Sequence, residues 1–193
     1  FNGSVWVPLG DTIFGSNSGD NLGNSVDISG DGNTIVIAAF AANNSHGETK
    51  IFDWNGLNWI QRGAEILGSS SSNITASGST TALSNNGAVL TIGEHGADFN
   101  KGTVRSFRWN NNSWQQIDNT ISPPLSSPTA MPCFGWGVDI NFNGSRMIAA
   151  SPLDGSGKIR VYENITLDST WHCDQSAGCQ WAGSNPSFPG QYA

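Results

Sequence analysis

Positive charge is scarce in this chain, which has eight Lys and Arg residues against fifteen Asp and Glu, and a net charge of −7 at neutral pH. A nucleic-acid-binding protein needs a basic surface that releases counterions from phosphates. We therefore expect no nucleic-acid partner. Long apolar runs are missing too, because none approaches the roughly 18 residues that a membrane-spanning helix requires. We expect no membrane span in this segment.

Cysteine is rare as well, with three residues, and the three histidines stand at no metal-ligand spacing relative to them. We expect no metal and no cofactor, since zinc sites use closely spaced Cys and His ligands. Cys173 and Cys179 lie close together in a Gly-containing segment, which favours a local disulfide over a metal site with His172. Cys133 pairs either with one of these two or with a cysteine outside the chain.

Turn-forming residues and tryptophan are plentiful. The chain has 24 glycines and eight tryptophans, and Asn and Ser are frequent. Glycine and asparagine tolerate the positive φ angles of tight turns. So many large aromatic residues are not typical of a disordered chain. The composition therefore predicts an all-β domain with many short strands.

The sequence also repeats with a period of about 55 residues. The three units cover residues 6–58, 59–113 and 114–170, each headed by a tryptophan, and a fourth start appears at Trp171. Four short antiparallel strands repeated at this spacing are typical of propeller blades. One four-stranded sheet cannot bury both of its faces, so such sheets stack. A sandwich or a solenoid is the competing architecture.

Four strands are expected in each unit. The first begins at the tryptophan, over 6–13, 59–66 and 114–121. The second, with its turn, covers 23–32, 78–87 and 135–144; the apolar third covers 34–40, 88–93 and 146–151; the fourth covers 47–54, 102–109 and 157–163. The turns contain the hairpin signals Asp31-Gly32, Asn86-Gly87 and Asn143-Gly144.

We therefore predict β-propeller blades: three full blades plus one extra strand at 6–13 that closes a different blade. Residues 1–170 would form the partial propeller. Residues 171–193 would be a Cys-containing segment that starts a further blade or acts as a linker. Three blades leave both ends of the stack uncovered, and the chain begins at Phe1. We expect further blades from the same longer chain or from another copy.

The motif around these turns resembles FG-GAP repeats, the blades of integrin α-subunit propellers and of many secreted propellers. The resemblance covers residues 6–170 and rests on GNSVDISGDGNTIVIAA at 23–39, on GETKIFDWNGLNW at 47–59, and on Gly135, Val138, Asp139, Ile140 and Ser151-Pro152. It implies a secreted or cell-surface propeller. Many family members carry a D-x-D-x-D-G calcium loop, but Asp31 is the only carboxylate in the three matching turns. Calcium needs several oxygen ligands, so we expect none there.

Six N-x-Ser/Thr sequons indicate an extracellular glycoprotein, although chance in an Asn- and Ser-rich chain is the alternative. Their acceptors are Asn2, Asn43, Asn73, Asn111, Asn143 and Asn164. The acceptors at 43, 111 and 143 fall in expected loops or turns.

Candidate sites are few. Trp136, between two glycines, is the best candidate for a ligand-facing aromatic, with packing as the alternative. The pairs Trp54 with Trp59 and Trp109 with Trp114 flank short hairpin loops and are expected to pack across the strands. Glu94, His95 and Asp98 form the densest polar cluster, which we interpret as a solvated loop, and no catalytic motif accompanies it.

The sequence favours an extracellular adhesion, matrix or surface-structure protein that binds a protein or glycan partner, and we expect no enzyme activity. One alternative is a propeller lectin, although such lectins repeat their sugar site in every blade. The second is a propeller-type polysaccharide-degrading enzyme. Asp27 and Asp139 within about 5–10 Å of each other in one pocket would support a glycosidase.

Overall fold

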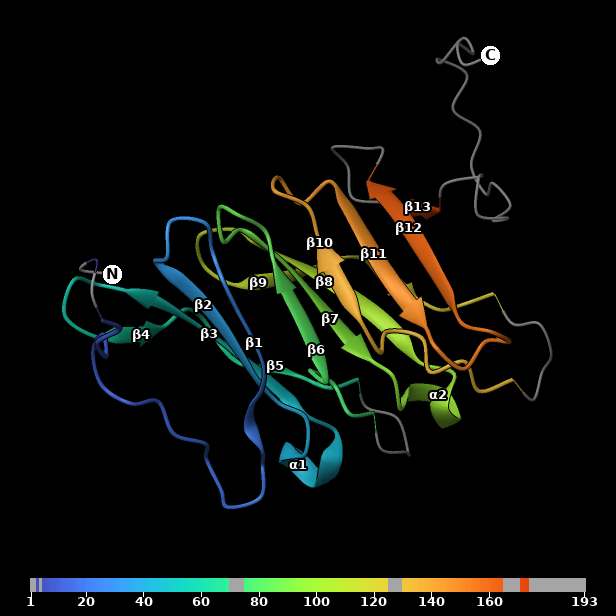
Figure 1. Cartoon of the computed structure of the whole chain (residues 1–193), viewed down its shortest axis with the longest axis horizontal. Helices are drawn as coiled ribbons and strands as arrows, with labels where there is room; N and C mark the ends of the chain where they lie inside the picture. Colours follow the sequence, from blue (N-terminus) through green and yellow to red (C-terminus); the bar gives the residue numbers. More distant parts are fainter. Residues whose placement is uncertain (1–2, 4, 70–74, 125–129, 165–170, 174–193) are drawn as a thin grey trace, which may run out of the picture.

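Three antiparallel sheets make up the computed structural model, which describes residue 3, residues 5–69, 75–124 and 130–164, and the backbone of 171–173 (Figure 1). Sheet 1 contains β1 (Leu22–Ile28), β2 (Thr34–Ala39), β3 (Glu48–Trp54), β4 (Trp59–Gln61) and β5 (Ile66–Leu67). Sheet 2 contains β6 (Thr80–Leu83), β7 (Val89–Glu94), β8 (Thr103–Trp109) and β9 (Trp114–Ile121). Sheet 3 contains β10 (Val138–Ile140), β11 (Arg146–Ser151), β12 (Lys158–Asn164) and β13 (Trp171–Cys173). Two short helical turns, α1 (Ala42–Ser45) and α2 (Ala97–Asn100), follow β2 and β7.

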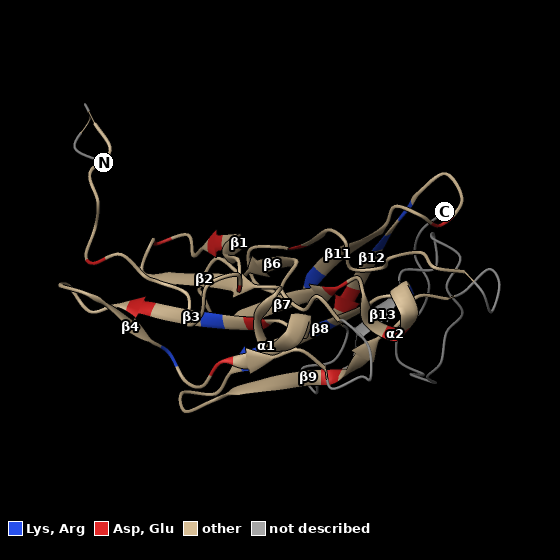
Figure 2. Cartoon of the chain, turned by 90° about the horizontal axis from the view of Figure 1, so that it is seen from below, with Lys and Arg blue, Asp and Glu red and all other residues tan. Residues whose placement is uncertain are grey.

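Consecutive strands are neighbours in each sheet, as in a propeller blade, except that β5 pairs with β3 rather than with β4. The sheets stack face to face, with β1, β6 and β10 along one side of the stack and β4 and β9 along the other (Figures 1 and 2). The predicted fold class, a partial β-propeller of four-stranded blades, is confirmed. No described helix is long and apolar enough to cross a membrane.

Two apolar cores lie between the sheets. Between sheets 1 and 2 the buried side chains are Val36, Ile51, Ile66, Leu83, Leu90, Ile92 and Phe107. Between sheets 2 and 3 they are Ala82, Val89, Val104, Ile117, Phe134, Ile140, Met147, Ala149 and Tyr162. Sheet 2 is covered on both faces, and every residue of β7 is consequently buried. This explains why its sequence is apolar or small at most positions rather than alternating.

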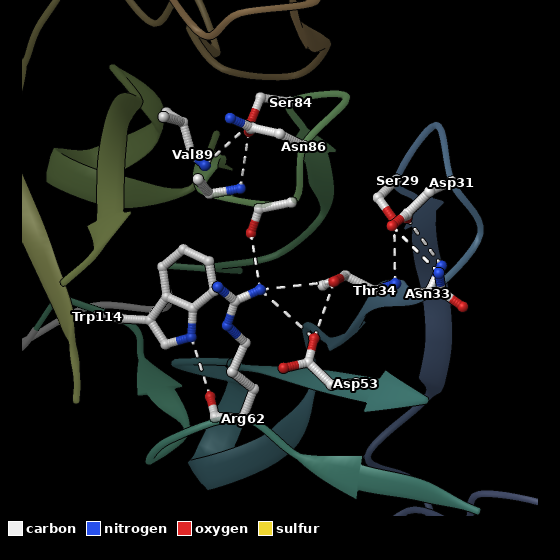
Figure 3. Close-up of polar contacts among 12 residues, drawn as sticks. Ser29, Asp31, Asn33, Thr34, Asp53, Arg62, Ser84, Asn86, Val89 and Trp114 are labelled. Atoms are coloured by element: carbon white, nitrogen blue, oxygen red, sulfur yellow. Dashed lines mark hydrogen bonds and ion pairs between the residues drawn. The ribbon is translucent and has the colours of Figure 1, made fainter. Parts of the chain in front are cut away.

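The turns between the first two strands of each sheet are built as predicted. Gly32, Gly87 and Gly144 have φ angles of 73°, 65° and 72°. In the first turn, Asp31 accepts hydrogen bonds from the Ser29 hydroxyl at 2.6 Å and from the Asn33 backbone at 3.0 Å (Figure 3). These bonds lower the pKa of Asp31 to about 2.

In sheets 1 and 2 a tryptophan pair at the outer edge contacts the chain segment that precedes the sheet. The ring centroids of Trp109 and Trp114 lie 5.5 Å apart. Trp114 Nε1 donates to the carbonyl of Arg62 at 3.0 Å (Figure 3). A Cβ on Gly63 would stand 2.8 Å from the Trp109 ring. The Arg62 guanidinium lies over the rings of both tryptophans and donates to the carbonyl of Gly87 in the next sheet at 3.1 Å. We call this arrangement the tryptophan latch.

Residues 6–13 differ from the predicted strand, because they belong to no sheet of the described chain. They nevertheless occupy a latch position. Trp59 Nε1 donates to the carbonyl of Leu9 at 3.0 Å, and a Cβ on Gly10 would stand 2.7 Å from the Trp54 ring. The segment therefore lies where the outer strand of a preceding sheet would lie, although the described residues contain no such sheet.

The sheets are offset by one strand from the sequence units. The tryptophan-led segment predicted as a strand over 59–66 pairs with β3 and so completes sheet 1 rather than beginning sheet 2. It is split into β4 and β5 around Gly63, which has a φ of 78°. The corresponding segment at 114–121 forms the continuous strand β9, as predicted.

Replacing Gly63 by Ala tests the latch. Gly56 is the matched control: its φ is +96° and no atom lies within 4 Å of its added Cβ, whereas the Cβ on Gly63 would meet Trp109. Both variants carry the strain of a left-handed residue. We expect Gly63→Ala to lower the free energy of unfolding by about 1–3 kcal/mol more than Gly56→Ala does, because it also overpacks the latch. Urea denaturation measures both, and equal losses would show that the latch does not constrain this position.

Candidate functional site

A pocket of about 240 Å³ opens where the first strands of the sheets begin, and all three sheets contribute to it. Its lining side chains are Asn24, Phe40, Ser79, His95 and Trp136. Three of these residues occupy the same place in their repeat, immediately after the glycine at 23, 78 or 135. The stacking of the sheets therefore brings one residue from each unit to the same opening.

Trp136 and His95 form the aromatic wall of this pocket. Their ring centroids lie 4.6 Å apart with planes tilted by 50°, and Trp136 remains 55% exposed. His95 Nδ1 shares a hydrogen bond of 2.8 Å with the Ser79 hydroxyl, and the Asn24 amide donates to the Ser79 carbonyl at 3.2 Å. Burial lowers the pKa of His95 below its ordinary value, so its ring is neutral at pH 7. The pocket thus combines an open aromatic face with uncharged polar groups.

The local sequence explains how Trp136 reaches the pocket. Gly135 has a φ of 82°, and a Cβ there would stand 2.6 Å from the carbonyl oxygen of Thr103. Only glycine fits so close to the neighbouring sheet. The Trp136 amide donates to the Cys133 carbonyl at 3.2 Å, which closes the turn and leaves the indole at the surface. The sequence-based expectation that Trp136 faces a possible ligand thus coincides with its place in the pocket.

The interpretation of Glu94, His95 and Asp98 as one solvated cluster is wrong for Glu94. Glu94 is 0% exposed and binds Arg105 through Nη2 at 2.6 Å and Nε at 3.1 Å. Its carboxylate also accepts hydrogen bonds from Ser69 and Thr103. Asp98 instead lies at the surface, paired with Lys101 at 3.0 Å. The alternation of the strand explains the separation, because Glu94 ends β7 facing inward while the chain turns outward after it.

Asp27 and Asp139 do not share a pocket. Asp27 lines a hollow with Val26 on the outer side of sheet 1, whereas Asp139 lines another with Ile148 on sheet 3. Asp27 also accepts a hydrogen bond of 2.7 Å from the backbone of Leu83, so it ties β1 to β6. Among the described residues, no three His, Cys, Asp or Glu side chains are grouped as metal ligands would be.

The remaining predicted residues are spread over the molecule. Asn43, Asn111 and Asn143 are exposed in turns, and Asn164 is half-buried at the end of β12. Asn2, Asn73, Cys179 and the side chain of Cys173 lie outside the described residues, so the disulfide stays a prediction. Cys133 is buried and has no disulfide partner among the described residues, and burial raises the pKa of its thiol.

Sequence reasoning missed the partners of Trp136. Asn24 and Ser79 could have been found by aligning the units, because they are its repeat equivalents. His95 and Phe40 likewise share a repeat position, directly after β7 and β2. Nothing in the spacing alone indicates that these two sets face each other across the sheets.

Glu94→Gln tests the buried ion pair that supports the pocket strand. It leaves the Arg105 charge buried without its partner, so we expect the free energy of unfolding to fall by about 3–5 kcal/mol. Glu163→Gln is the control, because the Arg146–Glu163 pair at 2.8 Å has side chains 61% and 43% exposed. An exposed pair contributes about 1 kcal/mol or less. Chemical denaturation that gives both variants the same small loss would contradict the structural role of Glu94.

Comparison with known proteins finds no matching family model and no matching curated protein, so the FG-GAP resemblance gains no support. Among solved structures, one from a structural and mechanistic analysis of two prolyl endopeptidases is 14% identical and covers 79% of this chain and 21% of its own, at a TM-score of 0.47. TolB from Acinetobacter baumannii is 12% identical and covers 80% of this chain and 32% of its own, at a TM-score of 0.42. The chain thus spans about a fifth and a third of the lengths of these two proteins.

Proposed function

We propose that the protein is a non-enzymatic binding scaffold of an extracellular surface or matrix, and that its ligand is a glycan held against Trp136. The observation that carries this proposal is the composite pocket, to which all three sheets contribute a side chain. The stacking of the sheets places these side chains before a ligand arrives, and preorganised groups lose less entropy when they bind.

The chemistry of the pocket suits a sugar ring. A pyranose has an apolar face, which stacks on an exposed indole, and a rim of hydroxyl groups that need hydrogen-bond partners. Asn24 offers an amide, Ser79 a hydroxyl and His95 a neutral imidazole, and each of these groups accepts or donates without a net charge. This combination favours a neutral polyhydroxylated ligand over a charged one.

The repeat supports one site rather than one site per blade. At the position of Trp136 the other units carry Asn24 and Ser79, and at the position of His95 they carry Phe40 and Pro152. A lectin with equivalent sites in every blade would keep the same residues at these places. The enzyme alternative has less support, because no carboxylate lines this pocket.

An extracellular location is part of the same proposal. It is supported by the sequon acceptors at 43, 111 and 143, which are exposed in turns where a glycan has room. Scarce charge and abundant polar turn residues are compatible with it but do not require it. In such a location, a glycan-binding scaffold would serve in adhesion or in the structure of the surface.

Trp136→Ala tests the glycan site. Phe99→Ala is the matched control, since Phe99 is 63% exposed in α2, close in sequence to His95, but does not line the pocket. A glycan array on the wild type identifies the ligand, and calorimetry then compares the variants. We expect Trp136→Ala to weaken binding at least ten-fold, or about 1.4 kcal/mol, because the stacking face is lost, with Phe99→Ala unchanged. An array without any bound glycan, or equal affinities for both variants, would contradict the proposal.

A further inference from the structure

Among the described residues, nothing covers two apolar sheet faces at opposite ends of the stack. The leading face is the side of sheet 1 that points away from sheet 2 and consists of Val26, Ile28, Ile35 and Ile37. The trailing face is the side of sheet 3 that points away from sheet 2 and includes Ile148, Ile159 and Val161. Val26 is 63% exposed and Ile159 is 68% exposed. Hollows of about 330 Å³ and 280 Å³ mark the two faces.

Repeat equivalence shows what these faces are built to contact. Ile28 occupies the repeat position of Leu83 and Ile140, which are buried against the preceding sheet. Its face is therefore of the type that packs on a preceding sheet.

The trailing face is the other half of the same kind of contact. Ile148 and Val161 occupy the positions of Val36 and Ile51, which are buried against the following sheet. Both repeat positions carry aliphatic side chains in sheet 3, as they do in sheet 1, where they line the core between sheets 1 and 2. The chain thus displays both complementary halves of the packing that it already uses internally.

The turn glycines repeat this complementarity. A Cβ on Gly87 would stand 2.8 Å from Thr34 of the preceding sheet, and one on Gly144 would stand 2.8 Å from Val89. A Cβ on Gly32 would have only Ile28 of the same sheet nearby, at 4.0 Å. Among the described residues, nothing therefore stands where Thr34 and Val89 stand beside the other two turn glycines. The residue that corresponds to Thr34 and Val89 at the trailing end is Arg146, which is exposed. Asp31, beside Gly32, would meet the Arg146–Glu163 ion pair there, whose nitrogen and oxygen lie 2.8 Å apart.

We propose that a second copy of this chain covers these faces, with the leading face of each copy packed on the trailing face of the other. Such a head-to-tail contact either closes into a ring or grows into a filament. Closed propellers have about four to eight blades, and two copies of the three described sheets supply six. The assembly is therefore a dimer that forms a six-bladed ring.

The segment 5–13 fits this dimer. It already lies against Trp54 and Trp59 of sheet 1, in the place of the outer strand of a preceding sheet. In the dimer the preceding sheet is sheet 3 of the second copy. Residues 7–13 then pair with its β12, on the edge where β13 pairs over three described residue positions.

Sedimentation velocity of single and mixed variants tests the proposal. Ile28→Glu places a charge on the leading face and Ile159→Glu places one on the trailing face, where the wild-type residues are 54% and 68% exposed. Leu57→Glu is the control, since Leu57 is 72% exposed in a hairpin loop outside both faces. We expect the wild type and Leu57→Glu to be dimers at about 100 μM, and each face variant to dimerise at least about ten-fold more weakly.

An equimolar mixture of the two face variants distinguishes this contact from any other. In a mixed dimer, the unchanged trailing face of the Ile28→Glu copy packs on the unchanged leading face of the Ile159→Glu copy. One of the two interfaces is therefore wild type, and we expect dimers to reappear in the mixture. A monomeric wild type, face variants that dimerise like the wild type, or a mixture that stays monomeric would each overturn the proposal. Near-ultraviolet circular dichroism checks the folding of each variant, and Val26→Asp and Val161→Asp replace any variant that fails this check. Glycan binding at Trp136 is measured separately, so the two proposals fail independently.

Discussion

The packing of one sheet face on the next is the interaction on which the rest of this structure depends. A four-stranded sheet has two faces, and each remains exposed unless a neighbouring sheet covers it. Here two shared cores join three sheets, and the central sheet is the one covered on both sides. The latch around Trp114 and the ties from Asp27 and Arg62 fix the sheets at this spacing. This packing of sheet on sheet creates the pocket, and it leaves one face of sheet 1 and one face of sheet 3 exposed among the described residues.

The pocket owes its geometry to this stacking rather than to any single unit. Each sheet supplies a residue at or just before the start of its first strand, and the three residues differ in type: Asn24, Ser79 and Trp136. Because the same repeat position carries a different side chain in each unit, the three side chains together form one composite site rather than three equal sites. Function on a propeller belongs to such sites and not to the fold itself.

Much of the fold could be predicted from the sequence, because local signals and the global arrangement agree. The turn at Asp31-Gly32, the apolar strand β7 and the pairing of Trp54 with Trp59 all follow from residue types at fixed offsets. The contacts between sheets were harder to foresee. The burial of Glu94 depends on Arg105 eleven positions later, and the state of residues 6–13 depends on a sheet that the described chain does not contain. Periodicity places strands but does not specify which side chains meet across sheets.

The central claim is that sheet 2 is covered on both faces and that sheets 1 and 3 are covered on one. Amide hydrogen exchange measures this most directly, at a dilution where the chain is a single copy. The account predicts that the slowest amides lie in β7 and β8, and that β2 and β11 exchange faster because each belongs to a sheet with an open face. Equal protection of β2, β7 and β11 would contradict the stack of three sheets.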